Sequence, residues 1–271
     1  LNILYKFKLN KIKKMIVHNF SEIKLLNASD KPLIIMFPFA GGNMYSFRNM
    51  WEDLSIMFDI LCPELPGRGD LIELSPISDI NLLIDYIFTN YIQPLRLEKP
   101  YILYGHSMGA LLSYLVAIEL VKKKYNLPIY LFVSGREGPS SKKKEILHNL
   151  PFKSFFIRLQ ELGGIPFELY ENIDFLNYIE PIIRADFKAV ENYNYEVSSK
   201  LNIPILVFYG SKEDILYENL LLWEVVTNKK VKYIQMEGGH FFIYDHAKSI
   251  VKFIIDTIFN ASGLNNRCTT S

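Results

Sequence analysis

The chain has 271 residues, of which 49% are hydrophobic and 14% aromatic, so its composition excludes an intrinsically disordered protein. Lysine and arginine (30) balance aspartate and glutamate (29), and this near-zero net charge argues against nucleic-acid binding as the main task. Its two cysteines, Cys62 and Cys268, make neither a disulfide framework nor a four-ligand zinc site, and we expect a cytoplasmic protein.

The amino-terminal residues 1–14 are rich in lysine, but no long apolar stretch or small-residue cleavage site follows them, so they do not fit a secretory signal. We expect them to be an extension, and Met15 is a candidate start of the chain. Residues 101–118 lack charge, yet the Gly-His-Ser-Met-Gly segment inside them indicates a buried strand that turns into a buried helix. We therefore expect no membrane span there.

Short apolar runs alternate with amphipathic stretches along the rest of the chain. The runs predict buried strands at 33–37, 60–62, 101–104, 129–133, 205–209 and 231–236. The stretches predict helices at 47–57, 77–91, 110–124, 220–226 and 246–259. This alternation predicts a mostly parallel central sheet with helices on both faces, an α/β fold.

One long stretch, residues 140–195, has helical patterning but no convincing strand. More than fifty residues between two strands is too long for a loop, so we expect a helical lid over the carboxyl edge of the sheet. The expected organisation is one domain over 15–260 that includes this lid, followed by a tail at 261–271.

A G-x-S-x-G segment at 105–109 follows the predicted strand 101–104 and precedes the predicted helix 110–124. This is the setting of a nucleophile elbow, in which a sharp turn exposes the serine oxygen above the sheet. The serine would also lie at a helix amino terminus, whose dipole favours developing negative charge. The pattern predicts Ser107 as a nucleophile.

A serine hydroxyl needs a base to take its proton, and in this fold the base follows the nucleophile and the acid along the chain. His240 comes just after the last predicted strand, and two glycines before it let the chain turn back toward the elbow. His246 also comes late enough, but it falls at the start of the last helix, where we expect a surface or capping role. We expect His106, beside the nucleophile, to be packed and hydrogen-bonded.

The acid of this triad should follow the predicted strand 205–209, where the chain reads Gly-Ser-Lys-Glu-Asp. Either carboxylate of Glu213 and Asp214 could orient the imidazole, and we favour Asp214. Glu137, which follows the strand at 129–133, is a further alternative.

The oxyanion hole should use the backbone N–H of Met108, the residue after the nucleophile. The second N–H should come from the loop after the first strand, with Ala40 as the candidate and Phe39 as the alternative. Arg68, in a Pro-Gly-Arg-Gly turn, could meet an anionic group near the site or simply point into solvent. We expect no metal site and no bound cofactor, because the sequence lacks metal-ligand spacings and glycine-rich phosphate loops.

Taken together, these segments resemble the type II thioesterases, the stand-alone editing enzymes of nonribosomal peptide and polyketide assembly lines. The resemblance covers about 33–259 in the right order. The segments that carry it are FPFAGGN at 37–43, ELPGRGD at 64–70, YGHSMGA at 104–110, FVSGR at 132–136, LGGIP at 162–166, RADF at 184–187 and GGHFF at 238–242.

The resemblance implies an α/β-hydrolase fold and hydrolysis of acyl or aminoacyl thioesters on the phosphopantetheine arm of carrier-protein domains. It places the nucleophile at Ser107, the base at His240 and the oxyanion amides at Met108 and Ala40. In the family the acid often lies three residues after the glycine, which is Glu213 here, so Asp214 fits only if one residue is inserted.

Two features of the lid would suit a carrier partner. Its apolar and aromatic residues would line an acyl chamber: Phe152, Phe155, Phe156, Leu159, Phe167, Tyr170, Phe175 and Tyr178. The second feature is a group of lysines that would steer an acidic carrier domain: Lys142, Lys143, Lys144 and Lys153. No nucleic-acid or membrane partner is expected. The alternatives are a carboxylesterase or lipase that cleaves oxygen esters, and a non-catalytic binding protein that keeps the fold.

Overall fold

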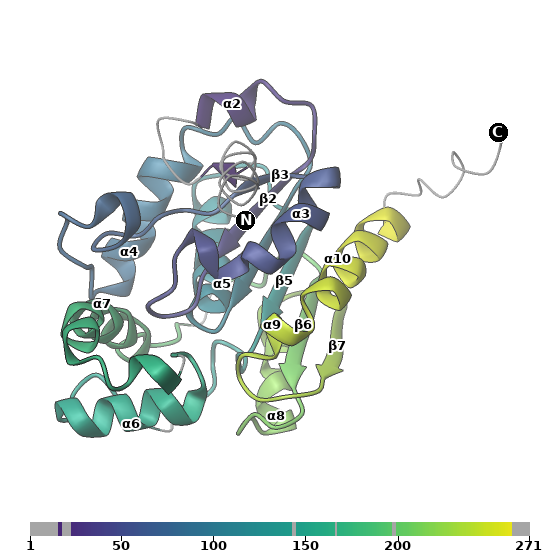
Figure 1. Cartoon of the computed structure of the whole chain (residues 1–271). Coiled ribbons are helices and arrows are strands. Elements are labelled where there is room, and N and C mark those ends of the chain that lie inside the picture. The colour runs from purple at the N-terminus through teal and green to yellow at the C-terminus, as the bar shows by residue number, and fades with distance from the viewer. Residues whose placement is uncertain (1–15, 18–22, 143–144, 166, 197–198, 262–271) are drawn as a thin grey trace, which may run out of the picture.

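The computed structural model describes residues 16–17, 23–142, 145–165, 167–196 and 199–261. Within them, parallel strands form one sheet in the order β1-β3-β2-β4-β5-β6-β7 (Figure 1). The strands are β1 (Ile16–Val17), β2 (Leu33–Phe37), β3 (Asp59–Leu61), β4 (Tyr101–His106), β5 (Tyr130–Ser134), β6 (Ile205–Gly210) and β7 (Val231–Met236). The predicted parallel α/β sheet is confirmed.

The three central strands β2, β4 and β5 are buried along their whole length, which explains their continuous apolar sequences. Their register pairs Phe37 with Gly105, and His106 with Ser134. The loops that follow these strands therefore start side by side at the carboxyl edge of the sheet. This edge is where open α/β sheets bind ligands.

Helices cover both faces of the sheet. One face packs against α3 (Arg48–Met57) and α10 (Ala247–Ala261), and the other against α4 (Ile80–Ile87) and α5 (Met108–Lys122). Short helical elements fill the connections: α2 (Ile23–Asn27), α8 (Tyr217–Leu220), α9 (Phe242–Asp245), the 3₁₀ turns Met44–Phe47, Gly69–Leu71, Phe167–Leu169 and Leu221–Val226, and the π turn Phe88–Ile92.

Two predicted helices differ from those observed. The predicted helix 77–91 begins only at Ile80, because the Asp79 carboxylate accepts the N–H groups of Asn81 and Leu82 and caps it there. This helix ends at Ile87 and continues as the π turn Phe88–Ile92. The predicted helix 220–226 is mainly a 3₁₀ turn preceded by the single turn of α8.

The predicted helical lid is present as α6 (Phe152–Leu162) and α7 (Ile173–Glu191). Apolar side chains of the two helices pack on one another in a cluster that includes Phe155, Phe156 and Ile183. The lid thus has a small core of its own, and Figure 1 shows it beside the carboxyl edge of the sheet.

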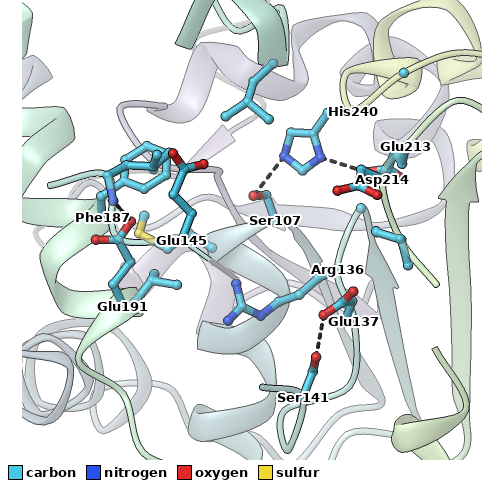
Figure 2. Close-up of a pocket in the computed structure, with 18 of the residues that line it drawn as sticks. Ser107, Arg136, Glu137, Ser141, Glu145, Phe187, Glu191, Glu213, Asp214 and His240 are labelled. Carbon is cyan, nitrogen blue, oxygen red and sulfur yellow. Dashed lines mark hydrogen bonds and ion pairs between the residues drawn. The ribbon is translucent and has the colours of Figure 1, made fainter. Parts of the chain in front are cut away.

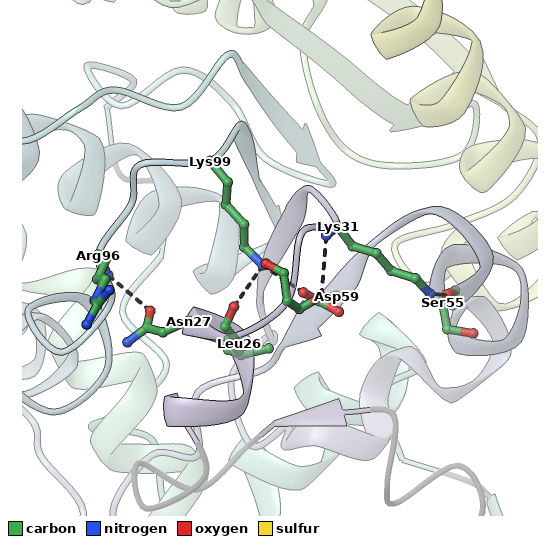
Figure 3. Close-up of polar contacts among 8 residues, drawn as sticks. Leu26, Asn27, Lys31, Ser55, Asp59, Arg96 and Lys99 are labelled. Carbon is green, nitrogen blue, oxygen red and sulfur yellow. Dashed lines mark hydrogen bonds and ion pairs between the residues drawn. The ribbon is translucent and has the colours of Figure 1, made fainter.

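Polar contacts fasten α2 to the sheet (Figure 3). The Lys99 amine donates to the Asp59 carboxylate at 2.7 Å and to the Leu26 carbonyl at 2.9 Å. Among the described helices, none is long and apolar enough to cross a bilayer. Most of the uncharged segment 101–118 forms β4 and the first part of α5. The expected extension at 1–14 and all but the first residue of the expected tail at 261–271 lie outside the described residues.

Candidate active site

Ser107 occupies the turn between β4 and α5, with φ of 56° and ψ of −112°. Non-glycine residues rarely adopt positive φ, so surrounding contacts must hold this turn. The Ser107 N–H donates to the Ser134 carbonyl at 2.8 Å, and the Ser107 carbonyl accepts from Ala110 at 3.1 Å. The predicted elbow is therefore present.

The glycines on either side of the serine are required by close packing. A Cβ atom on Gly105 would lie 2.0 Å from the Gly109 carbonyl oxygen, and one on Gly109 would lie 1.8 Å from the Phe37 oxygen. No side chain fits at either position. Because neither glycine has a side chain, the start of α5 can pack against the ends of β2 and β4.

His240 lies between β7 and α9 and bridges two groups (Figure 2). Its Nε2 is 3.0 Å from the Ser107 hydroxyl oxygen, and its Nδ1 is 2.6 Å from Oε1 of Glu213. An ionised carboxylate only accepts, so Nδ1 carries the proton and Nε2 is left to accept from the serine. This is the arrangement that activates a serine nucleophile.

The structure places Glu213 against the imidazole, so the preference for Asp214 was wrong. Glu213 accepts the Gly210 N–H through its second oxygen at 2.6 Å, and its own N–H donates to the Gly210 carbonyl at 3.3 Å. This turn folds the Glu213 side chain inward until it is 2% exposed, whereas Asp214 is exposed. No inserted residue is needed, because Glu213 already lies three residues after the glycine.

The alternative candidates for the acid and the base, Glu137 and His246, have different roles. Glu137 accepts a hydrogen bond from Asn219 at 3.0 Å and another from Ser141. The ring of His246 donates to the Glu237 carbonyl at 2.9 Å, at the start of α10.

His106 is fully buried beneath the site, as a packed and hydrogen-bonded histidine. Its Nδ1 lies 2.9 Å from the Ser134 hydroxyl, and its ring centroid is 4.9 Å from that of His240. Burial, and secondarily the neighbouring His240, hold the pKa of His106 well below its usual range. His106 therefore stays neutral and adds no charge beside the base.

Both predicted oxyanion residues, Ala40 and Met108, line the same cavity as Ser107. Met108 is the first residue of α5, where an N–H has no acceptor within the helix. The alternative, Phe39, is not part of the lining, and its ring packs edge-on against Phe241 at 4.9 Å. The geometry favours Ala40 over Phe39.

A buried ion pair fixes the loop that carries Ala40. Arg68 binds Asp186 of α7 with both terminal nitrogens, at 2.7 and 2.8 Å, and also donates to the Gly42 carbonyl at 3.1 Å. The same Asp186 carboxylate accepts the Gly41 N–H at 2.7 Å. The anionic partner of Arg68 is thus a lid residue, and the pair clamps the candidate oxyanion loop to the lid.

The cavity above Ser107 has a volume of about 1210 Å³. The apolar residues that line this cavity from the lid region are not the ones that the sequence predicts for an acyl chamber. Of the predicted chamber residues, Phe155, Phe156 and Leu159 pack inside the lid core. The residues of this region that do line the cavity include Leu147, Leu162, Phe187 and Val190.

Of the four candidate docking lysines, Lys142 borders this cavity and Lys153 is exposed on α6. Lys143 and Lys144 lie outside the described residues. Within the part of the chain that the structure describes, no group of histidine, cysteine or carboxylate side chains could hold a metal ion.

The chain is similar to known proteins over most of its length. The family model described as "Thioesterase domain" matches residues 32–258. The gramicidin S biosynthesis protein GrsT of Aneurinibacillus migulanus is 29% identical, over 84% of this chain and 90% of that protein. The human medium-chain S-acyl fatty acid synthase thioesterase is 31% identical, over 86% of this chain and 89% of its own.

Solved structures give the same result. The type II thioesterase BorB from the borrelidin biosynthetic cluster is 28% identical, with a TM-score of 0.76, and the match covers 83% of this chain and 92% of BorB. The resemblance to type II thioesterases is thereby confirmed. Because the family match spans the elbow, His240 and most of the sheet, this chain belongs to the thioesterase family and is a thioester hydrolase with the α/β-hydrolase fold.

Proposed function

We propose that this thioesterase removes acyl or aminoacyl groups from the phosphopantetheine arm of carrier-protein domains and so clears stalled or mis-primed assembly lines. The observation that carries the proposal is the chain of hydrogen bonds from Ser107 through His240 to Glu213. The biosynthetic relatives support the choice of substrate, since GrsT is named for gramicidin S and BorB for borrelidin.

In the first half of the reaction, the Ser107 oxygen attacks the thioester carbonyl carbon while His240 Nε2 takes the hydroxyl proton. Glu213 stabilises the imidazolium through Nδ1. The amides of Ala40 and Met108 donate to the developing oxyanion. The carbon–sulfur bond then breaks, and His240 returns the proton to the departing pantetheine thiol.

In the second half, a water molecule attacks the acyl-serine carbonyl. His240 takes a proton from the water and gives it to the Ser107 oxygen as the ester bond breaks. The free acid leaves, and the enzyme returns to its starting state. No cofactor takes part, since the phosphopantetheine belongs to the partner.

The partner in this proposal is a carrier domain of a cytoplasmic synthetase. Its arm would reach Ser107 through the cavity between the lid and the carboxyl edge of the sheet. Lys142, exposed at the border of this cavity, is available to an acidic carrier surface.

The test compares a butyryl thioester with the matching butyryl oxygen ester, each with and without attachment to a carrier domain. The proposal predicts faster hydrolysis of the thioester, and faster still on the carrier. Preference for the oxygen ester would indicate a carboxylesterase. No turnover of any substrate, with no labelling of Ser107 by a fluorophosphonate, would indicate a binding protein.

A further inference from the structure

Arg136 follows β5 by two residues and lines the cavity that Ser107 also lines. Figure 2 shows its guanidinium extending into this space, away from its neighbour Glu137. The backbone carbonyl of Arg136 accepts the indole N–H of Trp223 at 3.1 Å, which anchors the residue at the base of its side chain. The guanidinium is therefore presented to whatever occupies the cavity.

This guanidinium has no protein acceptor among the residues that the structure describes. Burial lowers the pKa of Arg136 to about 10, although the nearby Tyr193 and Glu137 act in the opposite direction. The group remains charged near neutral pH. Arg136 is half-buried, and its guanidinium presents a positive charge and five hydrogen-bond donors to the cavity. A ligand with acceptor oxygens can use these donors.

The carboxylates on the lid side of the cavity are already held by other donors. Glu191 accepts the Leu147 N–H at 2.7 Å and pairs with the ring of His148. Glu145 accepts from Arg158 at 2.7 Å. On the other side, the neighbouring Glu137 accepts from Asn219 and Ser141. The Arg136 guanidinium is therefore available to acceptor atoms of a ligand in the cavity.

We propose that Arg136 is a substrate-binding residue that donates hydrogen bonds to a carbonyl or carboxylate oxygen of the bound thioester. The proposal rests on the proposed function of this site. The oxygen has two possible sources: an oxo or carboxyl group on the acyl chain, and an amide carbonyl of the pantetheine arm. A guanidinium suits either, because it only donates and its planar fork can hold one or two oxygens.

The test measures kcat/KM of Arg136→Met on three thioesters: acetoacetyl-pantetheine, butyryl-pantetheine and butyryl-ethanethiol. Methionine keeps an unbranched stem but removes every donor. Arg158→Met is the matched control, because Arg158 lines the same cavity but is paired with Glu145 and Glu161. Arg136→Lys is the second variant, which keeps the charge but not the planar fork.

Loss of a charged hydrogen bond to a ligand lowers kcat/KM by about 10- to 100-fold. A loss confined to acetoacetyl-pantetheine assigns the oxygen to the acyl group. A loss on both pantetheine thioesters, but not on butyryl-ethanethiol, assigns it to the arm. Equal losses on all three substrates, or no loss on any, would overturn the proposal, as would a similar pattern in Arg158→Met.

Two further measurements separate binding from folding and from turnover. Replacement of an arginine kept for stability would lower the melting temperature, whereas replacement of an arginine kept for ligand binding should leave the melting temperature nearly unchanged. Pantetheine and acetoacetate should each be titrated into the Ser107→Ala protein, with and without Arg136→Met. If either ligand binds in a way that depends on Arg136, the proposal is supported. A failure to turn over any thioester would then count only against the proposed function. If neither ligand binds in an Arg136-dependent way, the proposal fails.

Discussion

Glu213→Gln is the substitution that tests the corrected triad most sharply. The Glu213 carboxylate accepts two hydrogen bonds, one on each oxygen, from the Gly210 N–H and the His240 Nδ1–H. Glutamine has the same shape but only one acceptor oxygen. If that oxygen keeps Gly210, the amide NH₂ faces Nδ1, which must then accept. The imidazole proton moves to Nε2, and His240 can no longer take the proton of Ser107.

A wrong histidine tautomer costs about 10³- to 10⁴-fold in kcat in serine triads, or roughly 4 to 5.5 kcal/mol of transition-state stabilisation. Asp214→Asn should cost less than about threefold, because Asp214 is an exposed side chain and Glu213 makes the hydrogen bond to the ring. Release of thiol from an acyl-N-acetylcysteamine, followed with a thiol reagent, measures both variants, and circular dichroism checks that they fold. A larger loss in Asp214→Asn than in Glu213→Gln would refute the assignment of Glu213.

Four further variants probe the nucleophile and the surroundings of the triad. Ser107→Ala should fold normally and lose all labelling by a fluorophosphonate probe; mass spectrometry that finds the adduct elsewhere on the wild type would contradict the elbow assignment. Asp186→Asn should lower stability by about 3 to 5 kcal/mol, since it leaves buried Arg68 uncompensated. The double variant Arg68→Met, Asp186→Leu should regain stability in urea unfolding but not kcat, because the Gly41 N–H stays unanchored; full recovery of kcat would show that the clamp is only structural. The unfolded chain protonates His106 below about pH 6.5 while the buried ring stays neutral, so the wild type should lose about 1.4 kcal/mol more than His106→Gln from about pH 7.5 to about pH 5.5. Equal losses in urea unfolding would disprove a neutral His106.

The strands and the elbow are predictable from local patterns. The run Leu33–Phe37 is apolar at every position and lies between Pro32 and Pro38, which fits a short strand buried on both faces. The glycines two residues before and after Ser107 indicate that the backbones of the strand and the helix approach closely there. Both features can be recognised from residues that lie close together along the chain.

The choice of acid was not predictable in this way. Glu213 and Asp214 are adjacent and chemically alike, and only the turn at Gly210 decides which carboxylate folds inward. The spacing from the glycine that is frequent among type II thioesterases indicates Glu213, and here it is a better guide than residue type.

Contacts between residues that are far apart in the sequence are even harder to predict from local patterns. Arg68 and Asp186 are 118 residues apart, so nothing near either one indicates a partner. The lid aromatics follow the same helical pattern whether they face a cavity or one another, and Phe155 and Phe156 face one another. Sequence therefore located the lid but not its lining.

The central claim, that the substrate is an acyl group on a carrier domain, is tested most directly by one comparison. We would measure kcat/KM for the same butyryl group on a holo carrier protein and on coenzyme A, with Ser107→Ala as the blank. Docking contacts made only by the carrier predict a kcat/KM at least about tenfold higher for the acyl-carrier, since a contribution of about 1.4 kcal/mol suffices. Equal values for the two substrates would contradict the carrier assignment and leave a general thioesterase.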